Sequence, residues 1–211
     1  NANYGWILNM VSKLSENGIA GFILANGALS GGGEEYKIRR KLIENNLVEA
    51  ILVLPQDMFY TTNISVTLWI VNKNKKAQSK KVGDETRQYR DREKEILFMD
   101  LRQMGIPFEK KYIQFSEDDI KKITSTYHQW QVSTPLNQPG YQNIPEFCYS
   151  ASFEEVAKKD FSLVPSKYIE FVNRDENIDF DEKMKSLQSE FADLLKAEAK
   201  SKADLLSVFK E

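Results

Sequence analysis

Residues 47–73, LVEAILVLPQDMFYTTNISVTLWIVNK, decide the fold of this 211-residue chain. They contain two apolar runs rich in β-branched residues, 47–55 and 65–73, which are typical of buried strands. About ten residues separate the runs, too few for a crossover helix. The two strands are therefore predicted to pair antiparallel, joined by a loop that carries Phe59 and Tyr60.

The residues upstream predict a helix, a strand and a second helix. Residues 4–16 place apolar side chains at helical spacing, and Asn17-Gly18 provides a helix stop. IAGFILAN, residues 19–26, is a short apolar run that predicts a buried strand. Gly31–Gly33 then forms a turn before a helix with acidic residues first and basic residues later, as the helix dipole prefers. This order of elements is typical of an α/β fold.

The chain becomes strongly charged before the sheet resumes. Residues 72–94 contain nine Lys or Arg and four Asp or Glu, and such runs are usually solvated loops. The alternative is a basic loop that contacts phosphate groups. EILFMDL, residues 95–101, predicts a further strand that extends the sheet.

Residues 116–178 are expected to form a mostly helical and irregular region. Ser116 is predicted to N-cap a helix that reaches about Trp130, and a shorter helix is predicted over residues 151–159. Pro165 breaks the extended segment that follows.

The last predicted element is a long helix within residues 179–211. Its large apolar residues recur at alternating spacings of four and three, as in a coiled coil: Phe180, Met184, Leu187, Phe191 and Leu194. A lone helix cannot bury such a stripe within itself, so it needs either the body of the domain or another chain. The narrow seam favours a partner chain.

Composition limits the class of protein. Hydrophobic residues at 41% and charged residues at 28% are typical of a globular chain, and the apolar runs are too short to cross a bilayer. The formal net charge of -2 gives no global attraction to nucleic acid, so such binding requires a local patch or a partner subunit. His128 and Cys148 are the only histidine and cysteine, so no metal site is expected. Without a visible secretory signal or a second cysteine, a cytoplasmic setting is expected.

Several motifs occur together in a specific order. They are the glycine-led run GIAGFILAN, an Ile-Arg-Arg helix, Leu-Pro-x-x-Met-Phe-Tyr at 54–60, and a strand that ends in Asn72-Lys73. In this combination the chain resembles the modification subunit of type I restriction-modification systems, an N6-adenine DNA methyltransferase. The resemblance covers residues 4–73 and returns at ILFMDLR and FSLVPSKYI.

The resemblance implies a partial Rossmann-like methyltransferase sheet. Residues 3–115 would be the downstream half of the catalytic domain, with an antiparallel last strand pair, and the C-terminal region would follow. In this family the glycine motif for S-adenosylmethionine and the catalytic Asn-Pro-Pro-Phe/Tyr tetrapeptide lie further upstream. The sequence contains no Pro-Pro, and Gly31–Gly33 lacks the spacing of a nucleotide-binding motif. No catalytic or cofactor-binding residue is therefore predicted here, and the chain alone is expected to be inactive.

Phe59 is the site residue that the resemblance indicates. Methylation of adenine N6 requires the base to leave the duplex stack, and an aromatic side chain then packs against it. In related enzymes this residue just precedes the last antiparallel strand, where Phe59 stands; a core role for the ring is the alternative. Tyr60 and Asn26 are predicted at the edge of the same pocket, although Asn26 also suits a turn. Trp6 and Trp69 are predicted to be core residues.

Two functional interpretations remain open. In the first, the chain is part of an adenine-N6 methyltransferase whose implied partners are DNA, a specificity subunit that receives the terminal helix, and a restriction subunit. In the second, it is a non-catalytic interaction or scaffold module from a truncated methyltransferase gene. Because strands are expected to be missing from the sheet, the isolated chain is also predicted to self-associate.

Overall fold

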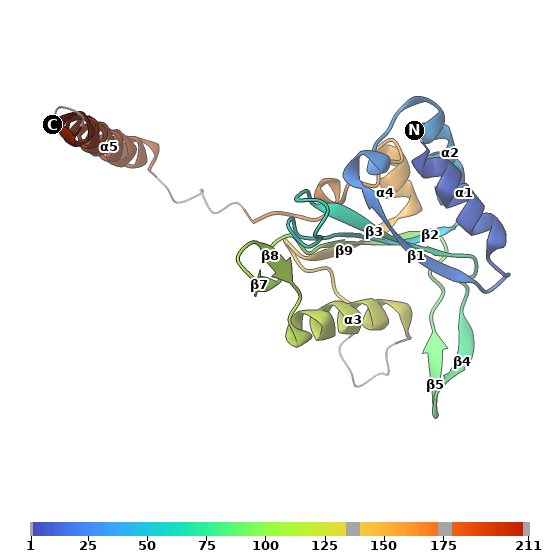
Figure 1. Ribbon diagram of the computed structural model, residues 1–211. Coiled ribbons are helices and arrows are strands. Elements are labelled where there is room, and N and C mark those ends of the chain that lie inside the picture. The colour runs from blue at the N-terminus through green and yellow to red at the C-terminus, as the bar shows by residue number, and fades with distance from the viewer. Residues whose placement is uncertain (1, 134–139, 173–178, 209–211) are drawn as a thin grey trace. The chain divides into compact units, whose positions relative to one another are not determined.

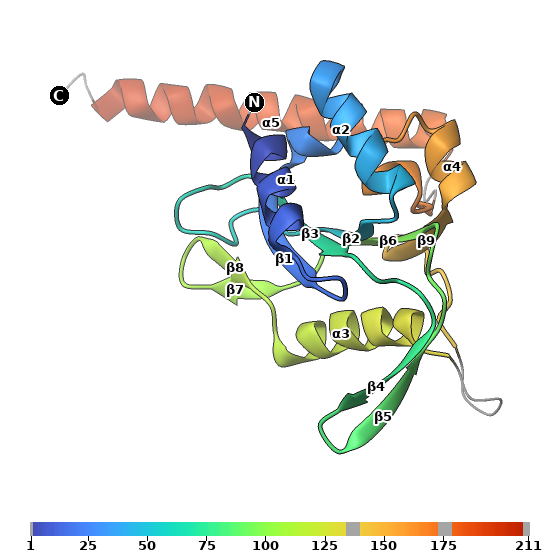
Figure 2. The ribbon, with the colours of Figure 1, turned by 90° about the vertical axis from the view of Figure 1, so that its right-hand side faces the viewer.

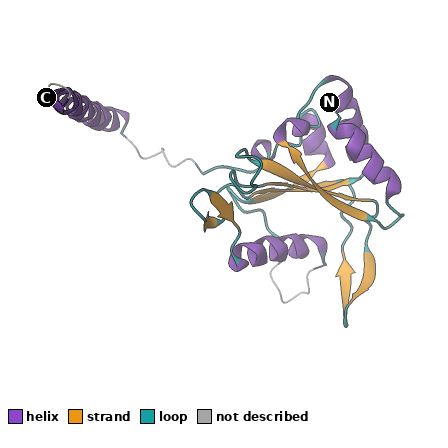
Figure 3. Cartoon of the chain, in the orientation of Figure 1, coloured by secondary structure: helices purple, strands orange, loops and turns teal. Residues whose placement is uncertain are grey.

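A five-stranded mixed sheet in the order β1-β3-β2-β6-β9 forms the centre of the first 171 residues (Figure 1). The computed structural model describes residues 2–133, 140–172 and 179–208. A second compact unit begins at Val172. Helices cover both faces of the sheet, as Figure 3 shows, so the predicted α/β class is confirmed.

The order of the strands follows from one short connection. β3 (Val66–Asn72) lies between β1 (Ile19–Ala25) and β2 (Val48–Val53) and pairs antiparallel with both, as predicted for the two quoted runs. β6 (Glu95–Asp100) is the predicted further strand and runs parallel to β2. β1, β2 and β6 therefore all point in the same direction.

One face of the sheet packs against three helices: α1 (Asn3–Lys13), α2 (Gly33–Glu44) and α4 (Phe153–Lys158) (Figure 1). The first two match the predicted N-terminal helices, and the third lies within the predicted short helix. Two 3-10 turns, η1 (Asn26–Leu29) and η2 (Pro165–Lys167), belong to the same side. The buried core on this face includes Ile7, Ile51, Trp69, Phe98 and Leu163.

The opposite face is covered by α3 (Glu117–Gln131). Ser116 caps this helix as predicted, because its hydroxyl accepts from the Asp119 backbone N–H while the Asp119 carboxylate accepts from Ser116. Trp130 is fully buried at the end of α3 and donates its Nε1–H to Ser150 at 2.8 Å. It anchors a second core, which also contains Ala50, Leu52, Leu97 and Met99.

β9 (Cys148–Ser152) is a strand that the sequence pattern did not indicate. It pairs antiparallel with β6 and forms the fifth strand of the sheet. Residues 148–152 are few and largely small or polar, so the sequence predicts a helical or irregular region there and not a strand. As a result, the predicted boundary at 115/116 does not separate two compact units.

β1 is not the buried strand that its apolar run predicts. It is one of the two edge strands of the sheet, and its residues alternate between partly buried and exposed. The side chains of Ile19 and Ile23 are 52% and 45% exposed, because none of the described helices of the first unit covers that end of the second face. Trp6 on α1 is likewise 62% exposed, so its predicted core role is wrong, whereas Trp69 is buried.

The basic segment 72–94 is not simply a solvated loop. Its middle forms a hairpin of β4 (Gln78–Val82) and β5 (Glu85–Tyr89) that projects from the sheet (Figure 1). Its two ends are buried, since Lys75 is 3% exposed and Arg92 is 1% exposed. The excursion is therefore anchored at its base and exposed at its tip.

A buried polar network provides that anchor. The fully buried carboxylate of Glu49 on β2 accepts from Arg92, from Gln131 of α3 and from Asn72 of β3. Arg92 also donates to the Arg90 carbonyl oxygen at 2.8 Å, and the Lys75 ammonium donates to the carbonyl oxygens of Val48 and Glu95. Buried charges are tolerated only when paired in this way.

The second unit contains α5 (Phe180–Val208), a single helix of 29 residues. The predicted coiled-coil seam lies along it, and its members are between 40% and 72% exposed. Residues 209–211 of the predicted helix lie outside the described residues. None of the described helices is long and apolar enough to cross a membrane.

The exposed edge of β1 predicts self-association of the isolated chain. Seven uncharged residues without proline form this edge, which favours pairing with another strand. We expect light scattering at high concentration to detect dimers or larger species, and Ile23→Lys to reduce them by placing a charge beside the edge. Ile120→Lys, at a comparably exposed position on α3, is the matched control and should change nothing. A wild-type chain that stays monomeric would contradict the prediction.

The burial of Lys75 predicts a pH dependence of stability. Desolvation lowers the pKa of this ammonium from 10.5 to about 8 in the folded chain. Between these values the unfolded chain binds one proton more, so the free energy of unfolding should rise with pH, by about 3 kcal/mol at most. Urea denaturation of Lys75→Met across this range should show a smaller rise than the wild type shows. The exposed neighbour gives the control, because Lys76→Met should keep the full rise; equal slopes in both variants would contradict the assignment.

Candidate nucleic-acid interface

The carboxyl ends of β1, β2 and β6 meet at one edge of the sheet, which we call the carboxyl edge. Asn26 follows β1, the loop 54–65 follows β2, and Asp100 ends β6. Polar and aromatic side chains from three separate chain segments are thereby brought together. Ligand sites of α/β folds form at this edge.

The loop 54–65 is closed tightly at its base and at its tip. At the base, Leu54 N–H donates to the Val66 carbonyl oxygen at 2.8 Å and the Ser65 hydroxyl donates to the Leu54 carbonyl oxygen at 2.6 Å. At the tip, Thr62 N–H donates to the Phe59 carbonyl oxygen at 3.3 Å. The two aromatic residues therefore occupy a turn with a defined conformation.

Phe59 and Tyr60 point to different environments. The Phe59 ring is half-buried and packs against the second core around Trp130. The Tyr60 ring is 71% exposed and lies edge-on to Tyr112, with ring centroids 4.7 Å apart. At the carboxyl edge, the Phe59 ring is therefore packed against the protein interior, whereas the Tyr60 ring lies on the surface.

Asn26 lines a cavity of about 100 Å³ at the carboxyl edge, together with Val53, Pro165 and Ser166. Its side-chain oxygen accepts a hydrogen bond from the Thr67 hydroxyl, which fixes the amide against β3. The structure therefore brings Asn26 to the edge with the loop 54–65, while the side chain also serves a structural role.

Asp100 and Arg102 line the same cavity and were not singled out from the sequence. Asp100 is buried, and its carboxylate accepts from Arg102 Nε at 2.9 Å and Nη2 at 2.5 Å. These hydrogen bonds raise the pKa of Arg102 above its ordinary value. The signal for both was their position directly at and after the end of a predicted strand.

A small hairpin extends the carboxyl edge. It consists of β7 (Ile106–Phe108) and β8 (Tyr112–Gln114), and no sequence pattern indicated it. Ile113 N–H donates to the Asp57 carbonyl oxygen at 3.0 Å, which ties the hairpin to the loop 54–65. Figure 2 shows the two segments side by side.

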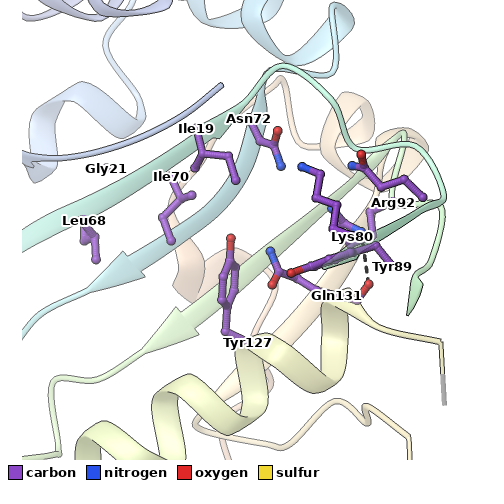
Figure 4. A pocket seen from close by; sticks show the side chains of 11 residues that line it. Ile19, Gly21, Leu68, Ile70, Asn72, Lys80, Tyr89, Arg92, Tyr127 and Gln131 are labelled. Carbon is purple, nitrogen blue, oxygen red and sulfur yellow. Dashed lines mark hydrogen bonds between the residues drawn. The ribbon is translucent and has the colours of Figure 1, made fainter. Parts of the chain in front are cut away.

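A larger cavity, of about 360 Å³, lies beneath β1 and β3 (Figure 4). Its apolar floor is the uncovered part of the sheet, and Tyr127 and Gln131 face it from α3. The buried guanidinium of Arg92 at its rim is already engaged by Glu49 and by backbone carbonyl oxygens. Its lining residues do not include Asn26, Phe59 or Tyr60.

The glycine turn before α2 contacts side chains of the helix that follows it. A Cβ atom at Gly31 would lie 2.0 Å from Glu35 Oε2, so the Glu35 side chain lies close beside the turn. Arg39 donates to the Gly31 carbonyl oxygen at 2.7 Å from the other side. Among the described residues, no group of three or more His, Cys, Asp or Glu side chains is placed to hold a metal ion.

Comparison with known proteins identifies the class to which this fold and edge belong. A family model described as N-6 DNA Methylase matches residues 1–177. The chain therefore belongs to the N-6 DNA methylase family.

Within that family, the chain is similar to methylase subunits of type I restriction enzymes, as its motifs predicted. It is 36% identical over 211 residues to the HindI methylase subunit of Haemophilus influenzae, covering 97% of this chain and 43% of that protein. It is 32% identical over 203 residues to the MjaIX methylase subunit of Methanocaldococcus jannaschii, covering 95% of this chain and 33% of that protein. The chain thus spans less than half the length of these relatives.

Solved structures support the fold. The methyltransferase subunit of the type I restriction-modification system of Streptococcus thermophilus superposes with a TM-score of 0.64 over 81% of this chain and 31% of its own, at 23% identity. The M protein of the type I restriction enzyme EcoKI gives a TM-score of 0.56 over 82% of this chain and 39% of its own, at 18% identity.

The lack of a cofactor motif in the sequence predicts that this chain alone does not bind S-adenosylmethionine. Titration calorimetry with the 211-residue chain should give no heat of binding, since Gly31–Gly33 lacks the spacing of a nucleotide-binding motif and no other glycine motif is present. A micromolar affinity would contradict this.

Proposed function

We propose that this chain is the downstream part of a type I methylase subunit that methylates N6 of adenine in DNA. In this assignment the sheet is the downstream half of a Rossmann-like methyltransferase sheet, and the catalytic tetrapeptide and the site for S-adenosylmethionine lie in parts that the chain does not contain. The single observation that carries the proposal is the position of the loop 54–65, at the carboxyl edge of the sheet in a member of the N-6 DNA methylase family.

Phe59 is the proposed stacking partner of the extruded adenine. Its ring packs against the second core and is only partly buried, and the exposed part of the ring is proposed to receive the base. A supported ring loses little freedom when a base packs on it, and stacking of this kind contributes about 1–3 kcal/mol per base. Asn26 and Tyr60 are proposed to form the edge of the same pocket.

The stripe on α5 is proposed to dock on the specificity subunit, with the restriction subunit as a further partner of the assembly. Its apolar members are exposed along several turns of the helix: Phe180, Met184, Leu187, Phe191 and Leu194. Water contact along such a seam is unfavourable, and a second helix removes it by knobs-into-holes packing. The alternative role, as a scaffold without catalysis, would use the same docking helix.

A Phe59→Ala variant of the full-length methylase, assembled with its specificity subunit, tests the proposal. We expect methyl transfer to the selected adenine to fall on the order of tenfold to a hundredfold, because about 1–3 kcal/mol of stacking is lost. The stability of the subunit should fall by only about 2 kcal/mol, less than for a fully buried Phe. Transfer of labelled methyl groups and urea denaturation measure the two effects.

Phe98→Ala provides the matched control, since that ring is fully buried in the core. Here stability and methylation should fall together. If Phe59→Ala behaves in the same way, the ring is core filler, and if the wild-type assembly transfers no methyl group, the scaffold role is the correct one.

A further inference from the structure

The surface formed by Tyr60 and the β7–β8 hairpin combines exposed rings with positive charge. Tyr60 is 71% exposed and contacts Tyr112 edge-on, and Phe108 on the same hairpin is 37% exposed. Glu109, Lys110 and Lys111 form the turn between the two strands and are all exposed. Exposed rings that lie together with charged residues can mark an interaction site.

The surface is rigid enough to act as a binding platform. The backbone hydrogen bond from Ile113 to Asp57 joins the hairpin to the loop 54–65, and the Tyr60–Tyr112 contact joins the two at the level of side chains. The Lys111 ammonium lies 5.9 Å from the centre of the Tyr112 ring, which holds the charge beside the aromatic pair.

Aromatic rings interleaved with lysines are a combination suited to nucleic acid. Lysine ammonium groups attract phosphates, while the rings pack against bases that are not paired. Glu109 and Asp57 are also near this surface, so its charge is mixed rather than purely basic. The two lysines lie at the turn of the hairpin. A helix from another protein would need a broader apolar stripe than the rings of this surface form.

We propose that Lys110, Lys111 and the exposed face of Tyr60 form a further DNA contact at the rim of the adenine pocket, which holds the backbone and an unpaired base next to the target adenine. This inference rests on the proposed function, because it places the contact next to Phe59 on the carboxyl edge. The β4–β5 hairpin, although also basic, follows the opposite end of β3 and lies at the other edge of the sheet.

The test compares two double variants of the complete methylase assembled with its specificity subunit. Lys110→Ala with Lys111→Ala should weaken binding to a labelled 30-base-pair duplex of unmethylated DNA on the order of tenfold near 0.1 M salt, and should reduce the salt slope of log K by about 2. Lys80→Ala with Lys81→Ala, in the β4–β5 hairpin, should leave both quantities unchanged. Fluorescence anisotropy over a series of salt concentrations gives both readouts.

Tyr60→Ala tests the aromatic part separately. It should weaken binding to the same duplex carrying one unpaired adenine more than binding to the fully paired duplex, with the salt slope unchanged. Equal losses for both lysine pairs, or no difference between the two duplexes, would overturn the proposal. So would a hairpin variant that no longer assembles with the specificity subunit in size-exclusion chromatography, because the surface would then be a protein interface. Wild-type methyl transfer is measured in parallel, so failure of the proposed function is seen independently.

Discussion

The short connection between β2 and β3 is the constraint on which the arrangement depends. The twelve-residue segment between them contains no helix, so the chain does not cross over the sheet and β3 returns antiparallel. It inserts between β1 and β2, which leaves these two strands parallel and two positions apart. The loop 54–65 is thereby fixed at the carboxyl edge, beside Asn26 and Asp100. The chain belongs to the N-6 DNA methylase family, and the proposed function assigns the adenine pocket to this edge.

Glu49 shows how the rest of the domain is fixed to that sheet. Placing a carboxylate where no water reaches it is unfavourable unless several donors surround it. Those donors come from β3, from the segment after β5 and from α3, and each of these elements is therefore held in one position. The bidentate Arg90–Glu95 pair, with Nη2 to Oε2 at 2.7 Å, secures the hairpin a second time. Residues 72–94, although rich in charged side chains, are thus an ordered part of the domain.

The sequence predicted correctly those elements that depend on residue periodicity or on the length of a connection between neighbouring segments. The antiparallel pair, the N-terminal helices, the Ser116 cap and the α5 seam all follow from patterns within a few residues. β9 and the exposure of β1 do not, since each depends on which distant segment lies alongside. Charge composition predicts that Lys75 and Arg92 are solvated, whereas both are buried. Their partners, the Val48 carbonyl oxygen and the Glu49 carboxylate, lie more than twenty residues away in the sequence. Asn26, Phe59 and Tyr60 lie at the carboxyl edge because each follows a predicted strand, and the same signal was available for Asp100 and Arg102. Tyr112 reaches the edge only by tertiary contacts, and the role of these residues as a site stays a prediction.

The unpaired side of β1 has a consequence for how the sheet can be extended. A strand with free amide and carbonyl groups along one side accepts another strand without rearrangement of the sheet. An extended peptide would therefore bind there as a sixth strand, with its register set by backbone pairing to β1.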